Sequence, residues 1–328
     1  MPYCHLNAFE RMKIQASLQV GCLPAEIARE LERPLSTITR ELKRNGGLLG
    51  RYCAVAAQRR CLERRKRASK PAKLSDQALR AAVEAKLKED LSPEQVTGRL
   101  ALEFPDNPAM RVSHETIYQH VYADKRRGGK LFEHLRQGHK KRQKRGNSKG
   151  RRGVIAGRVS IEERPAIVAA QGRVGDWEGD TVIGKNHKCP LATFVERSTL
   201  YTAAAKMPDK RAESLNNAAK AALTHIDSRL LRTITVDNGK EFAAFKALEK
   251  QLDVNIYFAR PYTSNDRAIN ENTNGLIRQY LPKGTNFTSL TQEQLNHILD
   301  RLNNRPRKKL GFRTPREALE EALIALQL

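Results

Sequence analysis

The sequence predicts a multidomain chain of mixed class, in which helical units precede a domain that alternates strands and helices. The length of 328 residues exceeds the usual range of one domain, so two or three domains are expected. Proline, glycine and capping residues divide the first 125 residues into short helical segments. From about residue 173, short apolar runs typical of strands alternate with helical patterns.

The chain is strongly basic, with a formal net charge of +24 and a pI near 10.1. Residues 1–152 contain 34 Lys and Arg against 16 Asp and Glu, and the remainder contains 26 against 20. A charge of this size indicates a polyanionic partner, for which nucleic acid is the leading candidate. The uneven distribution favours DNA-binding modules placed ahead of a less basic catalytic domain.

Cysteine usage and hydropathy predict a cytoplasmic protein. The five cysteines include no Cys-x-x-Cys pair, so neither a disulfide framework nor a zinc site has the expected spacing. The first residues do not resemble a signal peptide, and no apolar run approaches the ~20 residues that a membrane span needs. We therefore expect reduced cysteines and a cytoplasmic protein with access to DNA.

Residues 1–50 are expected to form a helix-turn-helix DNA-binding domain. Within residues 6–45, Gly21 breaks a first helix, and Pro24 and Pro34 open a second and a third at positions where proline is tolerated. The third helix suits a recognition helix in the major groove, because its outer face offers polar and basic side chains. These candidate DNA-binding residues are Ser36, Thr37, Thr39, Arg40, Lys43 and Arg44. The alternative is a small helical domain with a solvated basic face.

Three further segments lead to the catalytic region. Residues 51–74 are expected to be a basic helix or linker, helical up to Ser69, that contacts phosphates. Residues 75–124 are expected to form a second helix-turn-helix-like domain, with helices starting after the caps Ser92 and Ser113. A helical spacer is the alternative. Residues 125–172 are expected to be an extended basic linker, because like charges repel.

Residues 173–328 are expected to form the catalytic domain. Strand patterns at 176–184, 191–196 and 200–205 precede a helical pattern at 210–226, then a strand at 231–236 and a further helix. This βββαβα order matches a ribonuclease H-like mixed sheet. The capping sequence at Thr291 indicates a helix that closes the fold. The apolar positions of residues 316–328 indicate a short helix that packs either on the core or on another subunit. The basic residues 305–309 are interpreted either as DNA contacts or as exposed charge.

Three acidic residues are the candidate catalytic and metal-binding residues of this domain. Asp180 lies on the first strand, Asp237 ends the strand 231–236, and Glu271 lies near the start of a probable helix. Convergent carboxylates repel one another unless a cation neutralises them, and carboxylate oxygens suit Mg²⁺, for which Mn²⁺ can substitute. Two such ions, roughly 3.5 to 4 Å apart, support in-line displacement at phosphorus. The sequence therefore predicts phosphodiester cleavage and transfer.

Other polar and aromatic residues near the three acids have less specific interpretations. Arg278 follows Glu271 by two helical turns on the same face, where it could grip a DNA phosphate. Trp177 is expected to pack in the sheet. Glu178 and Glu241 are interpreted as solvated carboxylates or as residues that support the metal ligands.

The chain resembles bacterial DDE transposases of the insertion-sequence-thirty family, which have an integrase-like catalytic core. The resemblance rests on Trp177-Glu178-Gly179-Asp180, on Asp237-Asn238-Gly239-Lys240-Glu241-Phe242, on the run from Asn270 to Gly284, on the run from Asn304 to Pro315, and on Ser36-Thr37-Ile38-Thr39-Arg40-Glu41-Leu42. It covers nearly the whole chain. Asn265 and Ala268 depart from the pattern, because the family usually has Trp and Gly there.

The resemblance implies Mg²⁺-dependent cleavage at the terminal inverted repeats of an insertion sequence and joining of 3′-hydroxyl ends to target DNA. It also implies that Asp180, Asp237 and Glu271 are the metal ligands. Chemistry at two ends of an element requires at least two active sites, so a homodimer or larger synaptic assembly on double-stranded DNA is expected. Two alternatives are a catalytically inactive, sequence-specific DNA-binding regulator and a ribonuclease that acts on RNA:DNA hybrids.

Overall fold

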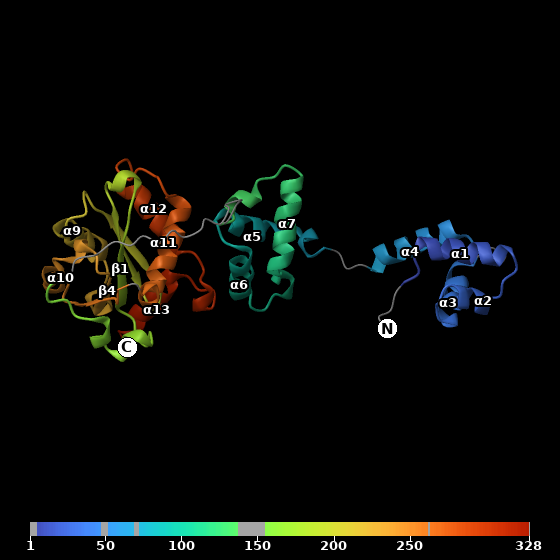
Figure 1. Ribbon diagram of the computed structural model, residues 1–328, viewed down its shortest axis with the longest axis horizontal. Coiled ribbons are helices and arrows are strands. Elements are labelled where there is room, and N and C mark those ends of the chain that lie inside the picture. Colours follow the sequence, from blue (N-terminus) through green and yellow to red (C-terminus); the bar gives the residue numbers. More distant parts are fainter. Residues whose placement is uncertain (1–4, 47–51, 69–71, 137–154, 262, 328) are drawn as a thin grey trace. The chain divides into compact units, whose positions relative to one another are not determined.

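The computed structural model describes residues 5–46, 52–68, 72–136, 155–261 and 263–327 (Figure 1). The chain divides into two compact units, Met1–Ser75 and Asp76–Leu328, and each is described by itself. Among the described residues, no helix combines the length and the apolar character needed to cross a membrane.

The first unit is helical and confirms the three helices expected from its proline and glycine residues. Its helices are α1 (Ala8–Gln19), α2 (Pro24–Glu30), α3 (Leu35–Asn45) and α4 (Ala54–Ala68). Gly21 follows α1 with a φ of +84°, a conformation that glycine adopts without strain. Pro24 is the first residue of α2, and Pro34 is the N-cap of α3.

The basic helix α4 packs on α1 and is part of this unit. Ala57 on α4 is fully buried in the same apolar cluster as Ile14, Ile27 and Ile38. The helix expected within residues 51–74 is confirmed, and it also contributes buried alanines to a shared core, which the sequence analysis did not foresee. The expected end of this helix, after Ser69, lies outside the described residues.

The second unit begins with three helices, α5 (Gln77–Lys88), α6 (Pro93–Glu103) and α7 (His114–Arg126). The side chains of Ser92 and Ser113 accept hydrogen bonds from the first turns of α6 and α7, as expected of N-caps. Helix α6 also contacts the C-terminal part of the unit, where Arg99 donates two hydrogen bonds of 2.9 and 2.7 Å to Glu317. One side of α6 is thus occupied by protein.

The catalytic region is built on a five-stranded sheet in the order β3-β2-β1-β4-β5. The strands are β1 (Asp176–Val182), β2 (Leu191–Glu196), β3 (Thr202–Lys206), β4 (Thr233–Val236) and β5 (Asn255–Phe258). β1, β2 and β3 pair antiparallel, whereas β4 pairs parallel with both β1 and β5. The first four strands were expected, but the short edge strand β5 was missed.

Two apolar clusters join the helices to the sheet. One contains Trp177 and Phe194 with residues of α9 (Ala212–Leu223) and α10 (Phe245–Leu252). Trp177 is fully buried and donates to the Leu230 carbonyl, which confirms the packing interpretation. The other cluster holds residues of α11 (Ala268–Tyr280) and α12 (Gln292–Asn303). Helix α13 (Pro315–Ala325) follows.

Two charged segments are packed differently from what the sequence predicted. In the expected basic linker 125–172, Ile155 and Val168 are buried, and Ser160 forms a β-bridge with Phe258. In the basic stretch 305–309, Arg305 and Arg307 are only 3% and 9% exposed, so neither DNA contact nor exposed charge describes them. Burial lowers the pKa of Arg307 to about 10. Charge patterns in the sequence did not distinguish these packed side chains from solvated ones.

Candidate functional site

The register of two parallel strands brings Asp180 and Asp237 to the same level of the sheet. Glu178 on β1 is paired with Thr235 on β4. Asp180 and Asp237 each come two residues further along, and two residues is the period at which strand side chains return to the same face. The sequence prediction that neighbouring strands bring these two carboxylates together agrees with this register.

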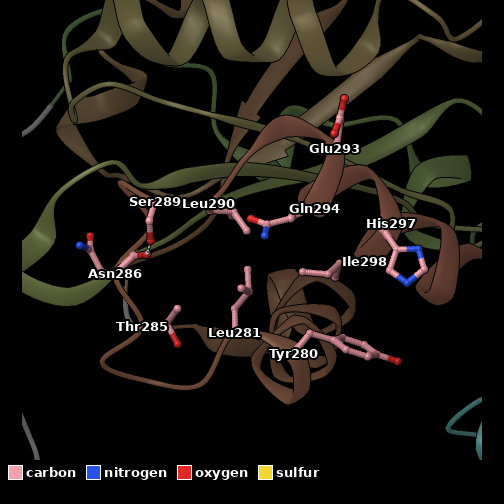
Figure 2. Close-up of a pocket in the computed structure, with 10 residues that line it drawn as sticks. All are labelled: Tyr280, Leu281, Thr285, Asn286, Ser289, Leu290, Glu293, Gln294, His297 and Ile298. Atoms are coloured by element: carbon pink, nitrogen blue, oxygen red, sulfur yellow. Dashed lines mark hydrogen bonds between the residues drawn. The ribbon is translucent and has the colours of Figure 1, made fainter.

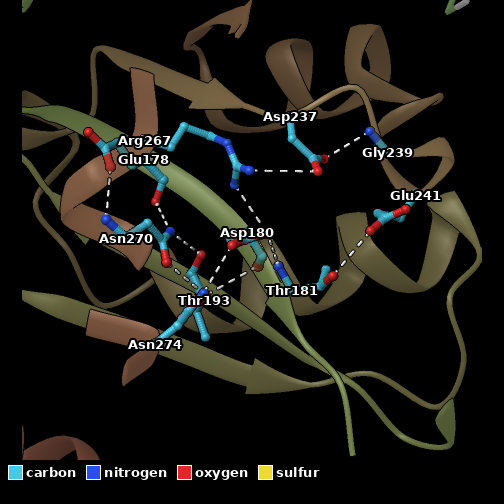
Figure 3. Close-up of polar contacts among 10 residues, drawn as sticks. All are labelled: Glu178, Asp180, Thr181, Thr193, Asp237, Gly239, Glu241, Arg267, Asn270 and Asn274. Atoms are coloured by element: carbon cyan, nitrogen blue, oxygen red, sulfur yellow. Dashed lines mark hydrogen bonds and ion pairs between the residues drawn. The ribbon is translucent and has the colours of Figure 1, made fainter. Parts of the chain in front are cut away.

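The carboxylate of Asp180 is held by two hydrogen bonds. Its Oδ1 accepts from the backbone N–H of Thr181 at 2.9 Å, and its Oδ2 accepts from the Asn274 side-chain amide at 2.9 Å (Figure 3). Burial raises the pKa of the Asp180 carboxyl, and the positive charge of Arg267 opposes that rise. The carboxylate is therefore fixed in orientation, and a nearby cation favours its ionised form.

Asp237 is held by the turn that follows β4. Its Oδ1 accepts from the backbone N–H of Gly239 at 2.8 Å. A Cβ atom at position 239 would lie 2.6 Å from Oε2 of Glu241 and 2.8 Å from Oδ1 of Asp237, so a larger residue there would displace one of these carboxylates. Glu241 in turn accepts from the Thr181 hydroxyl at 3.1 Å. A third carboxylate therefore lies beside the aspartates, as a supporting group.

Arg267 places a cation between the two aspartates, which the sequence analysis did not foresee. Its Nη1 lies 3.2 Å from Oδ1 of Asp180, and its Nη2 lies 3.7 Å from Oδ2 of Asp237. Figure 3 shows the guanidinium pointing into the space between them. Nη1 is buried, yet within the described structure it has no partner with hydrogen-bond geometry. The group thus supplies charge without a complete set of hydrogen bonds.

Glu271 lies one helical turn beyond Arg267, and its side chain is exposed. Across the described residues, no three His, Cys, Asp or Glu side chains converge closely enough to hold a metal ion. The structure therefore brings together Asp180 and Asp237 and leaves Glu271 apart from them. Its role as a metal ligand stays a prediction.

Helix α11, which carries Glu271, is fixed to the sheet by a fully buried asparagine. The Asn270 backbone N–H donates to Oε2 of Glu178 at 2.9 Å, and its side-chain amide donates to the Glu178 carbonyl at 2.8 Å. Glu178 is itself buried and pairs with Arg197. The sequence analysis left Glu178 either solvated or supporting, and the structure decides for support. Asn270 and Asn274 were missed, although they flank Glu271 in the resembling stretch.

Arg278 contacts protein groups in this structure. Its Nη2 donates to the Ile183 carbonyl at 2.6 Å, its Nη1 donates to the Leu281 carbonyl at 3.4 Å, and its guanidinium lies over the Phe287 ring. These contacts connect α11 to the end of β1. The expected phosphate contact of Arg278 stays a prediction.

In the first unit, α3 presents the candidate DNA-binding face. Ile38 is fully buried beneath it. Ser36, Thr39, Arg40, Lys43 and Arg44 are exposed, and Thr37 is half-buried. The Asn45 carbonyl near the end of α3 accepts from Arg60 of α4 at 3.2 Å, so a basic side chain of α4 lies beside this end of the helix. Contacts with DNA remain a prediction for all six residues.

A large hollow lies apart from the aspartates, between the end of α11 and the start of α12 (Figure 2). Its volume is about 820 Å³. Glu293 is the one carboxylate among its lining residues, and none of the candidate catalytic residues lines it. The polar cluster at the ends of β1 and β4 is therefore the stronger candidate for phosphoryl chemistry.

The mixed sheet places Asp180, on β1, beside Asp237, which follows β4, and the family models give the class of protein. The model of the integrase core domain family matches residues 171–264, and that of the helix-turn-helix domain family matches residues 3–45. The chain is also similar to a crystal structure of the catalytic core domain of BIV integrase, at 18% identity and a TM-score of 0.36, which covers 47% of this chain and 99% of that one. The first match runs through Asp180 and Asp237 and ends before Glu271.

Similarity to whole proteins identifies the family to which the chain belongs. It is 43% identical to the transposase for insertion sequence element IS4351 of Bacteroides fragilis, over 97% of this chain and 96% of that protein. It is 38% identical to transposase InsI for insertion sequence element IS30A of Escherichia coli K12, over 97% of this chain and 84% of that protein. The chain belongs to the IS30 family of insertion-sequence transposases. It is accordingly a DNA-binding transposase with an integrase-type polynucleotidyl transferase core.

Proposed function

We propose that this transposase binds the terminal inverted repeats of its insertion sequence and cleaves and joins DNA strands with Asp180, Asp237 and Glu271 as ligands of two Mg²⁺ ions. One observation carries the proposal. Asp180 and Asp237, from adjacent parallel strands, face one shared cationic group, the Arg267 guanidinium. Two fixed carboxylates around a positive charge supply two of the three protein ligands proposed for the divalent metal ions.

The donor set fits a hard divalent ion. Oδ2 of Asp180 and Oδ1 of Asp237 are engaged by the Asn274 amide and the Gly239 N–H, and the other oxygen of each carboxylate faces Arg267. Carboxylate oxygens are the ligands that Mg²⁺ and Mn²⁺ prefer. When bound, such ions supply an activated nucleophilic oxygen and stabilise the departing oxygen of a phosphodiester.

The protein's own contribution is orientation. Asn274 and Thr181 fix the Asp180 carboxylate, and Gly239 fixes that of Asp237, so little reorganisation is needed when phosphate arrives. Glu271 completes the site from the first turn of α11, which Asn270 holds against the sheet.

We further propose that the exposed face of α3 reads the terminal repeats in the major groove. Basic side chains of α4 beside it would add phosphate contacts. Cutting and joining two ends requires two active sites, which favours a homodimer or larger assembly on DNA. Such a protein would act in the bacterial cytoplasm, at the nucleoid.

The test is cleavage and joining of supercoiled plasmid by the purified chain with Mg²⁺ or Mn²⁺. We expect Asp180→Asn, Asp237→Asn and Glu271→Gln each to abolish metal-dependent products, because each removes one metal ligand. DNA binding, measured on sequences selected from a random pool, should survive in all three. Glu213→Gln, an exposed carboxylate on α9, is the matched control and should cleave normally.

The alternatives give different outcomes. Salt-sensitive, sequence-specific binding without cleavage of its selected DNA under either metal would indicate a binding-only regulator. Cleavage of RNA:DNA hybrids that ignores sequence would indicate a ribonuclease. Loss of DNA binding together with chemistry in all three variants would contradict the assigned roles.

A further inference from the structure

The position of Arg267 carries a further inference, which rests on the proposed metal site. The guanidinium lies between the two carboxylates, with Nη1 3.2 Å from Oδ1 of Asp180 and Nη2 3.7 Å from Oδ2 of Asp237. Its side chain is only 13% exposed. A divalent ion that binds both aspartates would have to occupy this same space.

Arg267 is held less firmly than Arg11, which has short hydrogen bonds to Glu41, the Leu6 carbonyl and Gln58. Its two aspartate contacts are 3.2 and 3.7 Å long, and its Nη1 has no hydrogen-bond partner within the described residues. A typical charge-assisted N–H···O bond is about 2.7–2.9 Å long. The guanidinium therefore relieves repulsion between the carboxylates without the directional bonds that would lock it in place.

Arg267 precedes the residue of α11 whose backbone is bonded to the sheet. Arg267 is the N-cap of α11 and lies at the junction with the short 3₁₀ turn Ser264–Arg267. Asn270, three residues later, is the first residue anchored to the sheet. Side-chain motion at position 267 thus leaves the anchored part of the helix in place.

We propose that Arg267 is a positioning residue that neutralises Asp180 and Asp237 in the metal-free protein and that a divalent ion binds only by displacing it. The inward guanidinium and the metal exclude each other, because both would lie between the same two carboxylates. The displaced guanidinium stays within reach of the site, where a DNA phosphate would be its next partner. Glu271, one turn further along α11, then joins the two aspartates as a ligand of the ion.

Competition of this kind lowers the apparent metal affinity by the fraction of molecules in which the site is open. If Arg267 is inward in about 90% of molecules, removing it raises the affinity about tenfold. Loss of a residue that merely supports the site would lower the affinity. The sign of the change therefore separates the two roles.

The experiment is calorimetric titration of the full metal-free chain with Mn²⁺. We expect Arg267→Gln to bind Mn²⁺ about tenfold more tightly than the unchanged chain. Arg267→Lys keeps the positive charge on a shorter side chain, and its Mn²⁺ affinity should lie between those of Arg267→Gln and the unchanged chain. Arg260→Gln is the matched control, because Arg260 pairs with Asp266 in the same loop and its loss removes the same charge. Its affinity should change by less than about twofold.

The melting temperature is the second measurement, and it shows whether Arg267→Gln still folds. In EDTA, Arg267→Gln should have a lower melting temperature than the unchanged chain, because two carboxylates then face each other unneutralised. Mn²⁺ should raise the melting temperature of Arg267→Gln by more than it raises that of the unchanged chain. Equal or weaker Mn²⁺ binding by Arg267→Gln would overturn the proposal. If Asp237→Asn binds Mn²⁺ as well as the unchanged chain, the carboxylate site itself fails. The first result would contradict only the role of Arg267, whereas the second would contradict the proposed metal site itself.

Discussion

Two regions of this transposase bury an arginine against carboxylate, and the two arginines are held in different ways. In the first unit, Arg11 donates to Glu41 at 2.7 Å, to the Leu6 carbonyl at 2.6 Å and to Gln58 at 2.7 Å. Tyr52 donates a further bond to Glu41. At the ends of β1 and β4, Arg267 has only long contacts with its two acids.

The difference separates a structural cluster from a functional one. A buried charge whose hydrogen bonds are complete contributes a fixed geometry, and removing one partner leaves the other charge uncompensated. A buried charge with incomplete hydrogen bonds can be replaced by another cation at lower cost. The first arrangement orients the helices that carry the candidate DNA-binding face, and the second belongs to the proposed metal site.

Removal of Glu41 should have the largest effect, because it breaks the complete cluster. We expect Glu41→Ala to lower the free energy of unfolding of the first unit by about 3–5 kcal/mol. Hydrogen exchange of the amides of α1 to α4 in the full chain measures this change. The single tryptophan, Trp177, lies in the second unit and reports by fluorescence whether that unit stays folded.

The matched control for Glu41 is Glu63, whose contact with Arg59 is exposed on α4. Glu63→Ala should change the same free energy by less than about 0.5 kcal/mol, because exposed ion pairs contribute little. Similar losses in both variants would show that the Arg11 cluster is no more important than a surface pair.

Asn274 offers an intermediate effect in the second cluster. Its amide fixes Oδ2 of Asp180, and loss of groups that orient a metal ligand costs about 10–100-fold in metal affinity. We expect Asn274→Ala to weaken Mn²⁺ binding by about this factor, opposite in sign to Arg267→Gln. Calorimetry measures both, and Asn272→Ala, an exposed neighbour on α11, is the control. An unchanged affinity in Asn274→Ala would remove Asn274 from the site.

An exposed arginine of α3 should show the smallest of these effects. Arg40 is two residues after the buried Ile38 and projects from the candidate DNA-binding face. We expect Arg40→Ala to weaken binding of selected DNA roughly fivefold, or ~1 kcal/mol, with no loss of folding. Fluorescence anisotropy of labelled DNA measures this affinity. Arg29→Ala, exposed on α2, should bind normally, and an equal loss there would point to general charge attraction.

The sequence predicted the local structure of both clusters well. Pro24, Pro34, Ser92 and Ser113 each mark a helix start, because a cap or an N-terminal proline acts within one turn of the chain. Four of the five strands were visible as apolar runs. The edge strand β5 was not, since its four residues alternate in burial and are too short to show a pattern.

The sequence by itself determined the family, the order of the helices and strands, and the two aspartates that neighbouring strands bring together. The tertiary structure alone decided which charged residues are buried: Glu178 and Arg197, Arg305 and Arg307, and Arg267 between the aspartates. The physical reason is the range of the interactions. Caps, turns and apolar periodicity are encoded by near neighbours, whereas the environment of a charged side chain depends on partners distant in the sequence, 92 residues away for the bond between Asn270 and Glu178.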